Sequence, residues 1–237
     1  MKRLFWQGGF GKQAANRLLD LVFPAGNLCH LCGQPLLGEN EVWLCEACVE
    51  ALERAAVPPS EQPLSLDDIL PCCMAAYQYH SPVQELVHSL KYRGDVAAAA
   101  PLAEGMARAY ALADSPEIHR SELLIPVPLH VKREKERGYN QAALLGERLS
   151  EHIGLAHHPY GLKRIHHTRS QVSAMSRERR LKNMVGAFEV ADIPLIYKKN
   201  ILLIDDVCTT GATAIACAHV LLACGAKEVK LLTACRA

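Results

Sequence analysis

Two adjacent carboxylates near the C-terminal end of the chain are followed closely by hydroxyl groups. In the segment NILLIDDVCTTGATA, residues 200–214, apolar residues precede Asp205 and Asp206, and a turn containing threonines comes next. The N–H groups and hydroxyls of such a turn can surround a phosphate at the positive end of the following helix. The carboxylates would be repelled by the phosphate itself, but one sugar ring away they can accept hydrogen bonds from a diol. The pattern therefore predicts a ribose 5-phosphate ligand, with room for a bridging divalent cation.

Glycine and small residues in this turn define the expected phosphate site. Gly211 has no side chain, so a ligand can approach the backbone closely there. The residues expected to hold the phosphate are Thr209, Thr210, Gly211, Ala212 and Thr213. A P-loop nucleotide site is excluded because the sequence contains no G-x-x-x-x-G-K-[ST] segment. A hydroxyl that only caps the helix would explain one threonine but not the whole string.

Four cysteines near the N-terminus have the spacing of metal ligands. CHLC and CEAC form two C-x-x-C pairs, and two such pairs complete the tetrahedral sulfur shell that zinc favours. The expected ligands are Cys29, Cys32, Cys45 and Cys48. Because all four positions are filled by protein, the zinc should be structural and not catalytic. Four buried structural cysteines, or a redox pair, explain the doubled spacing less well.

Length and composition limit the classes of protein that the chain can belong to. Its 237 residues are 50% hydrophobic with a formal net charge of +1, which argues against a nucleic-acid binder recognisable from charge alone. The first residues contain Lys2 and Arg3 but no uninterrupted apolar run, so they predict neither a signal peptide nor a membrane span. We expect a cytoplasmic protein, where cysteines bind metal or are buried more often than they form disulfides.

The pattern along the chain predicts an α/β protein with a small N-terminal module. The proline-rich stretch 57–63 marks a linker, and strands alternating with helices afterwards predict a parallel sheet flanked by helices. We expect an N-terminal helix and a four-cysteine zinc-binding module over 1–57, a linker over 58–75 and the main domain over 76–237. Predicted helices cover 83–90, 96–111, 142–153 and 213–224, predicted strands cover 122–129, 200–205 and 228–235, and predicted loops cover 130–141 and 163–182.

At this point the sequence resembles a known family. ILLIDDVCTTGAT resembles the phosphoribosyl pyrophosphate (PRPP) binding motif of type I phosphoribosyltransferases. PVPLHVKREKERGYNQA, HHTRSQVSAMSRERRLKNMVGAF and the CHLC and CEAC pairs resemble segments of the ComF and GntX family, so that the resemblance covers nearly the whole chain. It implies a zinc-binding segment followed by a phosphoribosyltransferase-like domain. Many relatives carry further cysteine pairs where this chain has only Cys72 and Cys73, so one zinc is expected.

The resemblance assigns roles to residues at the predicted site. Asp205 and Asp206 would bind the ribose hydroxyls of PRPP, which arrives with Mg²⁺, and one of them would move a proton during catalysis. The basic stretch after Pro128 would be the pyrophosphate loop. Its expected binding residues are Lys132, Arg133, Arg137 and Gly138. Arg137 is favoured because its fork can hold two phosphate oxygens. A solvated charged loop remains the alternative, because glutamates alternate with these cations.

A second basic stretch resembles the flexible loop that closes over the active site of these transferases. Closure would exclude water, which competes for the activated ribose. The residues assigned to this loop are Arg169, Gln171, Arg177 and Arg180. Because the family is linked to DNA, the arginines of this stretch could instead contact nucleic acid.

Two functions remain open on the sequence. The first is a phosphoribosyltransferase of the ComF type, associated with DNA uptake, competence or the use of external DNA, with an acceptor that the sequence does not reveal. The alternative is a non-catalytic PRPP sensor or an adaptor in DNA uptake, because sensing and catalysis need the same phosphate site. The expected partners are PRPP, single-stranded DNA or a DNA-uptake helicase, and a second copy in a homodimer, with no insertion into a membrane.

Overall fold

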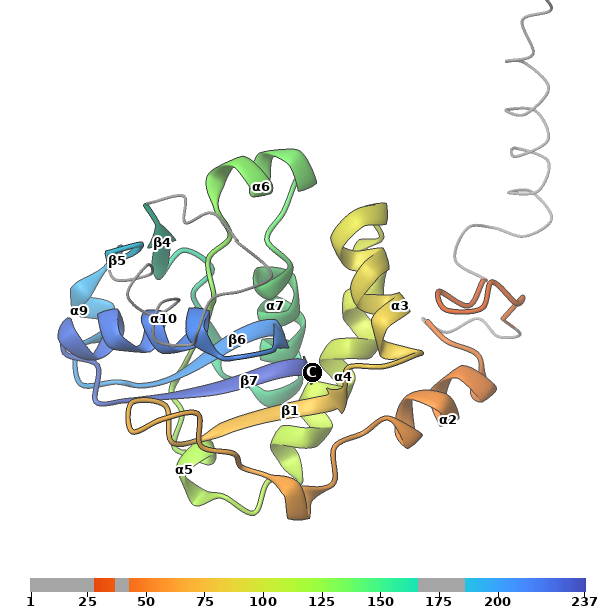
Figure 1. The fold of residues 1–237 in the computed structure, drawn as a ribbon, viewed down its shortest axis with the longest axis horizontal. Helices are drawn as coiled ribbons and strands as arrows, with labels where there is room; N and C mark the ends of the chain where they lie inside the picture. The colour runs from red at the N-terminus through yellow and green to blue at the C-terminus, as the bar shows by residue number, and fades with distance from the viewer. Residues whose placement is uncertain (1–27, 37–42, 166–185) are drawn as a thin grey trace, which may run out of the picture.

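A five-stranded parallel sheet forms the centre of the molecule (Figure 1). The computed structural model describes residues 28–36, 43–165 and 186–237. The order of the strands is β1-β7-β6-β2-β3, and every neighbouring pair is parallel. The strands are β1 (Cys73–Gln78), β2 (Leu123–Pro126), β3 (Ala156–His157), β6 (Asn200–Cys208) and β7 (Glu228–Arg236). The strands β4 (Leu162–Arg164) and β5 (Phe188–Val190) form a separate antiparallel pair.

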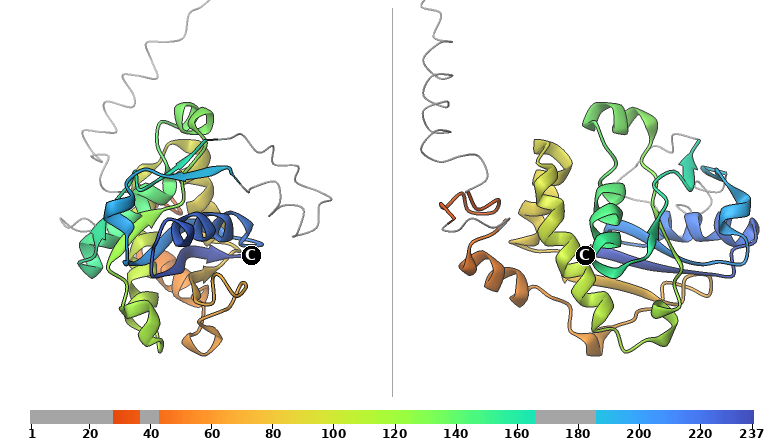
Figure 2. Two further views of the ribbon diagram at one scale, coloured as in Figure 1. Left: turned by 90° about the vertical axis from the view of Figure 1, so that its left-hand side faces the viewer. Right: turned by 180° about the vertical axis from the view of Figure 1, so that it is seen from behind.

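Helices cover both faces of the sheet, and α4 and α7 lie on the opposite face from α10 (Figure 2). The α-helices are α2 (Glu46–Arg54), α3 (Val83–His88), α4 (Ala99–Ala111), α5 (Pro116–His119), α6 (Val131–Arg137), α7 (Gln141–Ile153), α9 (Ile193–Ile196) and α10 (Ala212–Ala223). Shorter turns are η1 (Pro59–Glu61), η2 (Ser89–Arg93) and η3 (Val96–Ala98), of which η2 is a π-helical turn. The expected parallel sheet with flanking helices is therefore confirmed.

The central strand β6 shows why the sheet needs a continuous apolar run. Leu202 and Ile204 belong to the apolar cluster under α4 and α7, whereas Ile201 and Leu203 belong to the cluster under α10. Successive side chains of a strand point to opposite faces, so a strand covered on both faces must be apolar at every position. These four side chains have no exposed surface.

Helix α6 corrects the prediction of a loop over 130–141. His130 caps its first turn by accepting a hydrogen bond from the Lys132 N–H at 3.1 Å, and Gly138 ends it with a φ of +88°. The helix has no buried residue, so it lacks the apolar periodicity from which a helix is predicted. Its formation follows instead from its glutamate, lysine and arginine residues, which favour helix without any packing.

Strand β1 is a second element that the sequence did not reveal. Its residues, CMAAYQ, contain no β-branched side chain, so strand propensity is weak. It forms because it pairs with β7, with Cys73 opposite Leu231, and because α4 packs tightly over it. Gly105 of α4 leaves the space that the Tyr77 ring occupies. The sheet therefore includes the last three residues of the stretch 58–75 that was expected to be a linker.

The cysteine-bearing segment packs against the main domain. Leu44, Cys48 and Leu52 belong to the same apolar cluster as the sheet face under α4 and α7. A polar contact adds to this packing, because His30 Nδ1 lies 3.1 Å from Asp95 Oδ2. Within residues 28–36, 43–165 and 186–237, no helix combines the length and apolar character that crossing a bilayer requires.

Candidate functional site

The two aspartates lie where β6 extends beyond its neighbour β2. The pairing of β2 with β6 ends at Pro126 and Ile204, whereas β6 stays paired with β7 as far as Cys208 and Arg236. The strand is thus three residues longer than the predicted 200–205, and both aspartates are part of it. The carboxyl edge of a parallel sheet is where open α/β proteins bind ligands. The described positions of Asp205 and Asp206 agree with that rule.

The turn after β6 presents an uncapped helix N-terminus. Gly211 is the N-cap residue of α10 with a φ of +71°, and no side chain caps the helix. A hollow of about 40 Å³ is lined by Asp205, residues 207–214 and Leu231. The structure therefore brings residues 209–213 together around one small cavity. Because the threonine hydroxyls do not cap the helix, capping does not explain their presence.

Gly211 provides a direct test of this turn. Replacing Gly211 with alanine should lower the free energy of unfolding by about 1 to 3 kcal/mol, because a side chain is strained at positive φ. In addition, a Cβ atom at Gly211 would collide with the Leu66 side chain. Thermal unfolding measures this effect. Gly154→Ala is the matched control, since Gly154 has a φ of +72° with nothing within 4 Å of a Cβ atom. Equal destabilisation of the two variants would contradict a role for the Leu66 contact.

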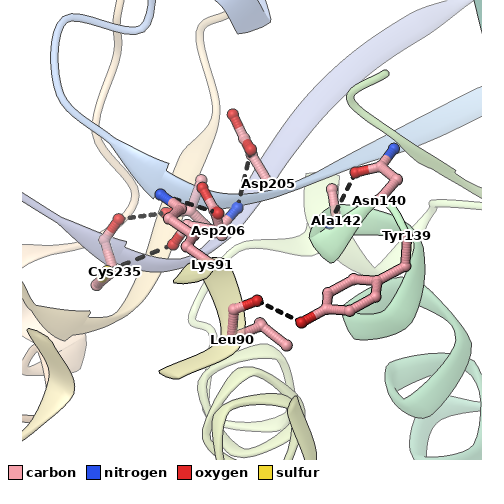
Figure 3. A network of polar contacts seen from close by, with 9 residues as sticks. Leu90, Lys91, Tyr139, Asn140, Ala142, Asp205, Asp206 and Cys235 are labelled. Atoms are coloured by element: carbon pink, nitrogen blue, oxygen red, sulfur yellow. Dashed lines mark hydrogen bonds and ion pairs between the residues drawn. The ribbon is translucent and has the colours of Figure 1, made fainter. Parts of the chain in front are cut away.

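The two carboxylates point to opposite sides of β6 (Figure 3). Asp205 lines the hollow beside α10, whereas Asp206 Oδ2 lies 2.9 Å from Lys91 Nζ of η2, on the other face. The Asp206 N–H donates a hydrogen bond to Asp205 Oδ1 at 2.9 Å. The Cys235 thiol donates to the backbone carbonyl of Asp206 at 3.3 Å. The alternation of a strand thus gives the adjacent aspartates different surroundings.

These surroundings shift the pKa values of the charged groups. Burial raises the pKa of Asp205 to about 8, and the neighbouring Asp206 carboxylate adds to this rise. Burial alone would lower the pKa of Lys91, but the Asp206 carboxylate more than offsets it, so the pKa of the ammonium is raised. The adjacent aspartates thus differ: the pKa of Asp205 is raised, whereas Asp206 is paired with a cation.

The basic residues expected to bind pyrophosphate lie on or beside α6, which projects away from the sheet (Figure 1). Arg133 and Arg137 are four residues apart and share one side of the helix. The Arg137 guanidinium lies over the Tyr92 ring at 5.5 Å from its centroid. Lys132 forms an exposed ion pair with Glu136 at 3.9 Å, and Gly138 ends the helix. A short helix replaces the loop that was expected there.

The two residues that follow Gly138, Tyr139 and Asn140, attach α6 to the rest of the site. The Asn140 side chain donates to the Val127 carbonyl at 3.0 Å and accepts from the Ala142 N–H at 3.1 Å. The Tyr139 hydroxyl donates to the Leu90 carbonyl at 2.7 Å. The junction between α6 and α7 is thereby joined both to the end of β2 and to η2.

Lys91 is the residue at this edge that sequence analysis missed. It stands in SLKYRG, where the sequence predicts the end of a helix and offers no sign of a partner. Its position follows from β1, because a chain leaving the carboxyl end of that strand returns through α3 and η2 to the same edge of the sheet. Without the strand assignment, its proximity to Asp206 could not be predicted.

The residues assigned to the flexible loop, Arg169, Gln171, Arg177 and Arg180, lie outside the described residues. The first two residues of the predicted loop 163–182 form part of a strand instead. Lys163 and Arg164 belong to β4, which pairs with β5, and Arg164 lies over the Phe188 ring at 5.5 Å from its centroid. Arg164 pairs with Phe188, which is 24 positions later in the chain, so the local sequence does not reveal this strand.

The four cysteines of the N-terminal pairs form one cluster. The Sγ atoms of Cys29, Cys32, Cys45 and Cys48 all lie within 4.8 Å of one another, and those of Cys32 and Cys45 are 3.6 Å apart. Four sulfurs around a zinc ion are roughly 3.8 Å apart, so the donor set fits such a metal. Cys72 and Cys73 are buried and take no part in this cluster. Among the described residues, it is the one group of its kind.

Comparison with known proteins agrees with this geometry. A family model described as "Phosphoribosyl transferase domain" matches residues 92–237. The chain is 31% identical over 226 residues to the DNA utilization protein YhgH of Salmonella typhimurium, covering 88% of this chain and 96% of that protein. It is also 31% identical over 201 residues to the competence protein ComFC of Bacillus subtilis, covering 83% and 72% of the two chains. The chain belongs to the ComF family.

A further member of the ComF family matches over a shorter region. The competence protein F of Haemophilus influenzae is 34% identical over 134 residues, which is 54% of this chain and 57% of that protein. The family match includes β2, β6 and β7, together with the turn at Gly211. For this ComF protein, the resemblance inferred from the sequence motifs is thus confirmed, as is the phosphoribosyltransferase domain.

Proposed function

We propose that this ComF-family protein binds PRPP together with Mg²⁺ at the carboxyl edge of its sheet. The observation that carries the proposal is the hollow that Asp205 shares with the uncapped N-terminus of α10. Free N–H groups and the helix dipole favour a phosphate in that position. The carboxylates then accept hydrogen bonds from the ribose at the distance of one sugar ring.

Different residues would bind the 5-phosphate, the ribose and the pyrophosphate of PRPP. Residues 209–213 bind the 5-phosphate, and Asp205 and Asp206 bind the ribose hydroxyls. The pyrophosphate is bound by Lys132, Arg133, Arg137 and Gly138. Carboxylate oxygens are donors that suit Mg²⁺, so Asp205 and Asp206 could hold the ion, which would supply positive charge to the bound ligand.

As a transferase, the protein would promote displacement at ribose C1. The bond from C1 to the pyrophosphate oxygen breaks, a bond from C1 to the acceptor forms, and one aspartate receives the proton that the acceptor loses. The α6 cations stabilise the negative charge that develops on the departing pyrophosphate. Its acceptor would enter from the side opposite the leaving group.

A role in DNA uptake or in the use of external DNA is proposed from the relatives, whose names describe competence and DNA utilization. One contact favours the sensor or adaptor alternative. His30, between two cysteines of the cluster, lies 3.1 Å from Asp95, which is two residues beyond the end of η2. A change at the PRPP site could therefore reach the cysteine module, where single-stranded DNA or a helicase would bind.

We further propose a structural zinc at the module, a cytoplasmic location and a homodimer.

Calorimetric titration with PRPP and Mg²⁺ tests the proposal. Binding with a dissociation constant in the micromolar range is expected, and no detectable heat at millimolar PRPP would refute it. Where binding is found, pyrophosphate release in the presence of a panel of bases and amines separates the two functions. Release with one acceptor class indicates a transferase, whereas binding without release with any of them indicates a sensor.

A further inference from the structure

We propose that Lys91 is a positioning residue for ribose binding: from the π-helical turn η2, its ammonium holds the Asp206 carboxylate in a fixed orientation. This inference rests on the proposed PRPP site and adds to it a segment that the sequence motifs do not include.

The ion pair between Lys91 and Asp206 is the first support. The Nζ to Oδ2 distance is 2.9 Å, and the Lys91 and Asp206 side chains are 21% and 12% exposed. Most other ion pairs among the described residues have two exposed partners, which contribute little to stability. A carboxylate this buried is costly to leave without a cation, and the Lys91 ammonium provides one. Lys91 therefore holds the Asp206 carboxylate toward η2, on the side of β6 opposite the Asp205 side chain.

The backbone of η2 is the second support. The turn is π-helical and ends at Gly94 with a φ of +70°. The N–H groups of Gly94 and Asp95 both donate to the Ser89 carbonyl, whereas the Leu90 carbonyl accepts from the Tyr139 hydroxyl at 2.7 Å (Figure 3). Single π-helical turns are rare and occur frequently at functional sites. Here the turn is fixed by a side chain from the segment that follows the pyrophosphate residues.

Tyr92 provides the third support. Its ring is 68% exposed, yet the guanidinium of Arg137 lies over it at 5.5 Å from the centroid. One turn of chain thus contacts Asp206 through Lys91, Arg137 through Tyr92, and Tyr139 through Leu90. These contacts connect the ribose side of the proposed site to its pyrophosphate side. The turn would consequently fix the distance between the two halves of PRPP.

The test is a double-mutant cycle on PRPP affinity, measured by calorimetry with Mg²⁺ on the full-length protein. Lys91→Met should weaken binding at least tenfold, Lys91→Arg should restore most of the loss because it keeps the charge, and Asp206→Asn should also weaken binding at least tenfold. The double variant should bind no more weakly than the weaker single variant, since both remove one interaction. Lys230→Met is the matched control, because it removes a buried ammonium 2.8 Å from Glu228 near the amino end of β7.

The outcomes separate this inference from the proposed function. If the wild type binds PRPP but Lys91→Met binds equally well, the positioning role is wrong and the proposed site stands. Independent, multiplicative losses in the double variant, or an equal loss in Lys230→Met, would also overturn it. Absence of binding by the wild type would overturn both proposals. Should Lys91→Met fail to fold, Tyr139→Phe decides: a severalfold loss of affinity with an intact fold supports the inference, and unchanged affinity overturns it.

Discussion

Replacing Asp205 with asparagine should stabilise the protein at pH 8 and weaken PRPP binding at least tenfold. The pKa of Asp205 rises from its ordinary value of 3.8 to about 8, first because desolvation at its half-buried position disfavours the ionised form and second because Asp206 repels that form. Between these two pH values, the unfolded chain loses the proton of Asp205 and the folded protein keeps it. The free energy of unfolding therefore falls as the pH rises from 3.8 to about 8, and stays lowered above that range.

Asparagine removes this penalty because it does not ionise. Because solvent screens the half-buried Asp205 carboxyl, we expect only part of the full shift to appear as stability. Asp205→Asn should gain about 1 to 2 kcal/mol at pH 8, which corresponds to a rise in Tm of roughly 2 to 8 °C, and should gain nothing below pH 4. The loss of affinity has a different cause, since the amide cannot ionise to the carboxylate that accepts hydrogen bonds from the ribose hydroxyls. Stability is measured by thermal unfolding at several pH values, and affinity by calorimetry.

Asp206→Asn serves as the comparison at the adjacent position. It makes the same chemical change but leaves the Lys91 ammonium without its partner at 2.9 Å. Removing one partner of a buried pair is destabilising, so this variant should have a lower Tm at neutral pH while also losing PRPP affinity. Two variants with equal stability, or an Asp205→Asn variant that binds PRPP as the wild type does, would contradict the site described above.

Removing metal from the cysteine cluster should have the second large effect. We expect elemental analysis to find one zinc per chain. The Cys48→Ser substitution or a strong chelator should remove this bound zinc. The free energy of unfolding of the N-terminal module should then fall by several kcal/mol, because metal binding supplies much of the folding energy of such small segments. Leu44 and Leu52 pack in the apolar cluster under α4 and α7. When the metal is lost this packing should loosen, so that the protection of α2 from hydrogen exchange disappears.

The matched control is Cys224→Ser, which alters a half-buried cysteine at the end of α10 that is outside the cluster. It should retain the zinc and the exchange pattern of α2. Comparison of PRPP affinity with and without metal then tests the contact between His30 and Asp95. A protein that contains no metal and yet keeps α2 fully protected would refute the structural zinc.

The sequence by itself determined the features whose chemistry is local. The segment IDDVCTTGAT specified a strand, an acidic pair and a glycine-containing turn before a helix, because each depends on neighbours within a few positions. The two C-x-x-C pairs predicted the cluster that the structure assembles, since each pair needs only a short turn to bring its thiols together. The parallel sheet followed from the alternation of strand and helix patterns along the chain. Family membership followed from these same segments.

Only the tertiary structure decided which residues surround the acidic pair. Strand β1 has weak propensity and exists because β7 lies beside it, and with that pairing η2 arrives at the carboxyl edge of β6. Helix α6 buries no side chain, so its sequence has no apolar pattern that predicts a helix. The assignment of Asp205 to one face and Asp206 to the other depends on what covers each face. Contacts between Lys91 and Asp206 join residues far apart in the sequence, and such contacts are set by packing and not by local pattern.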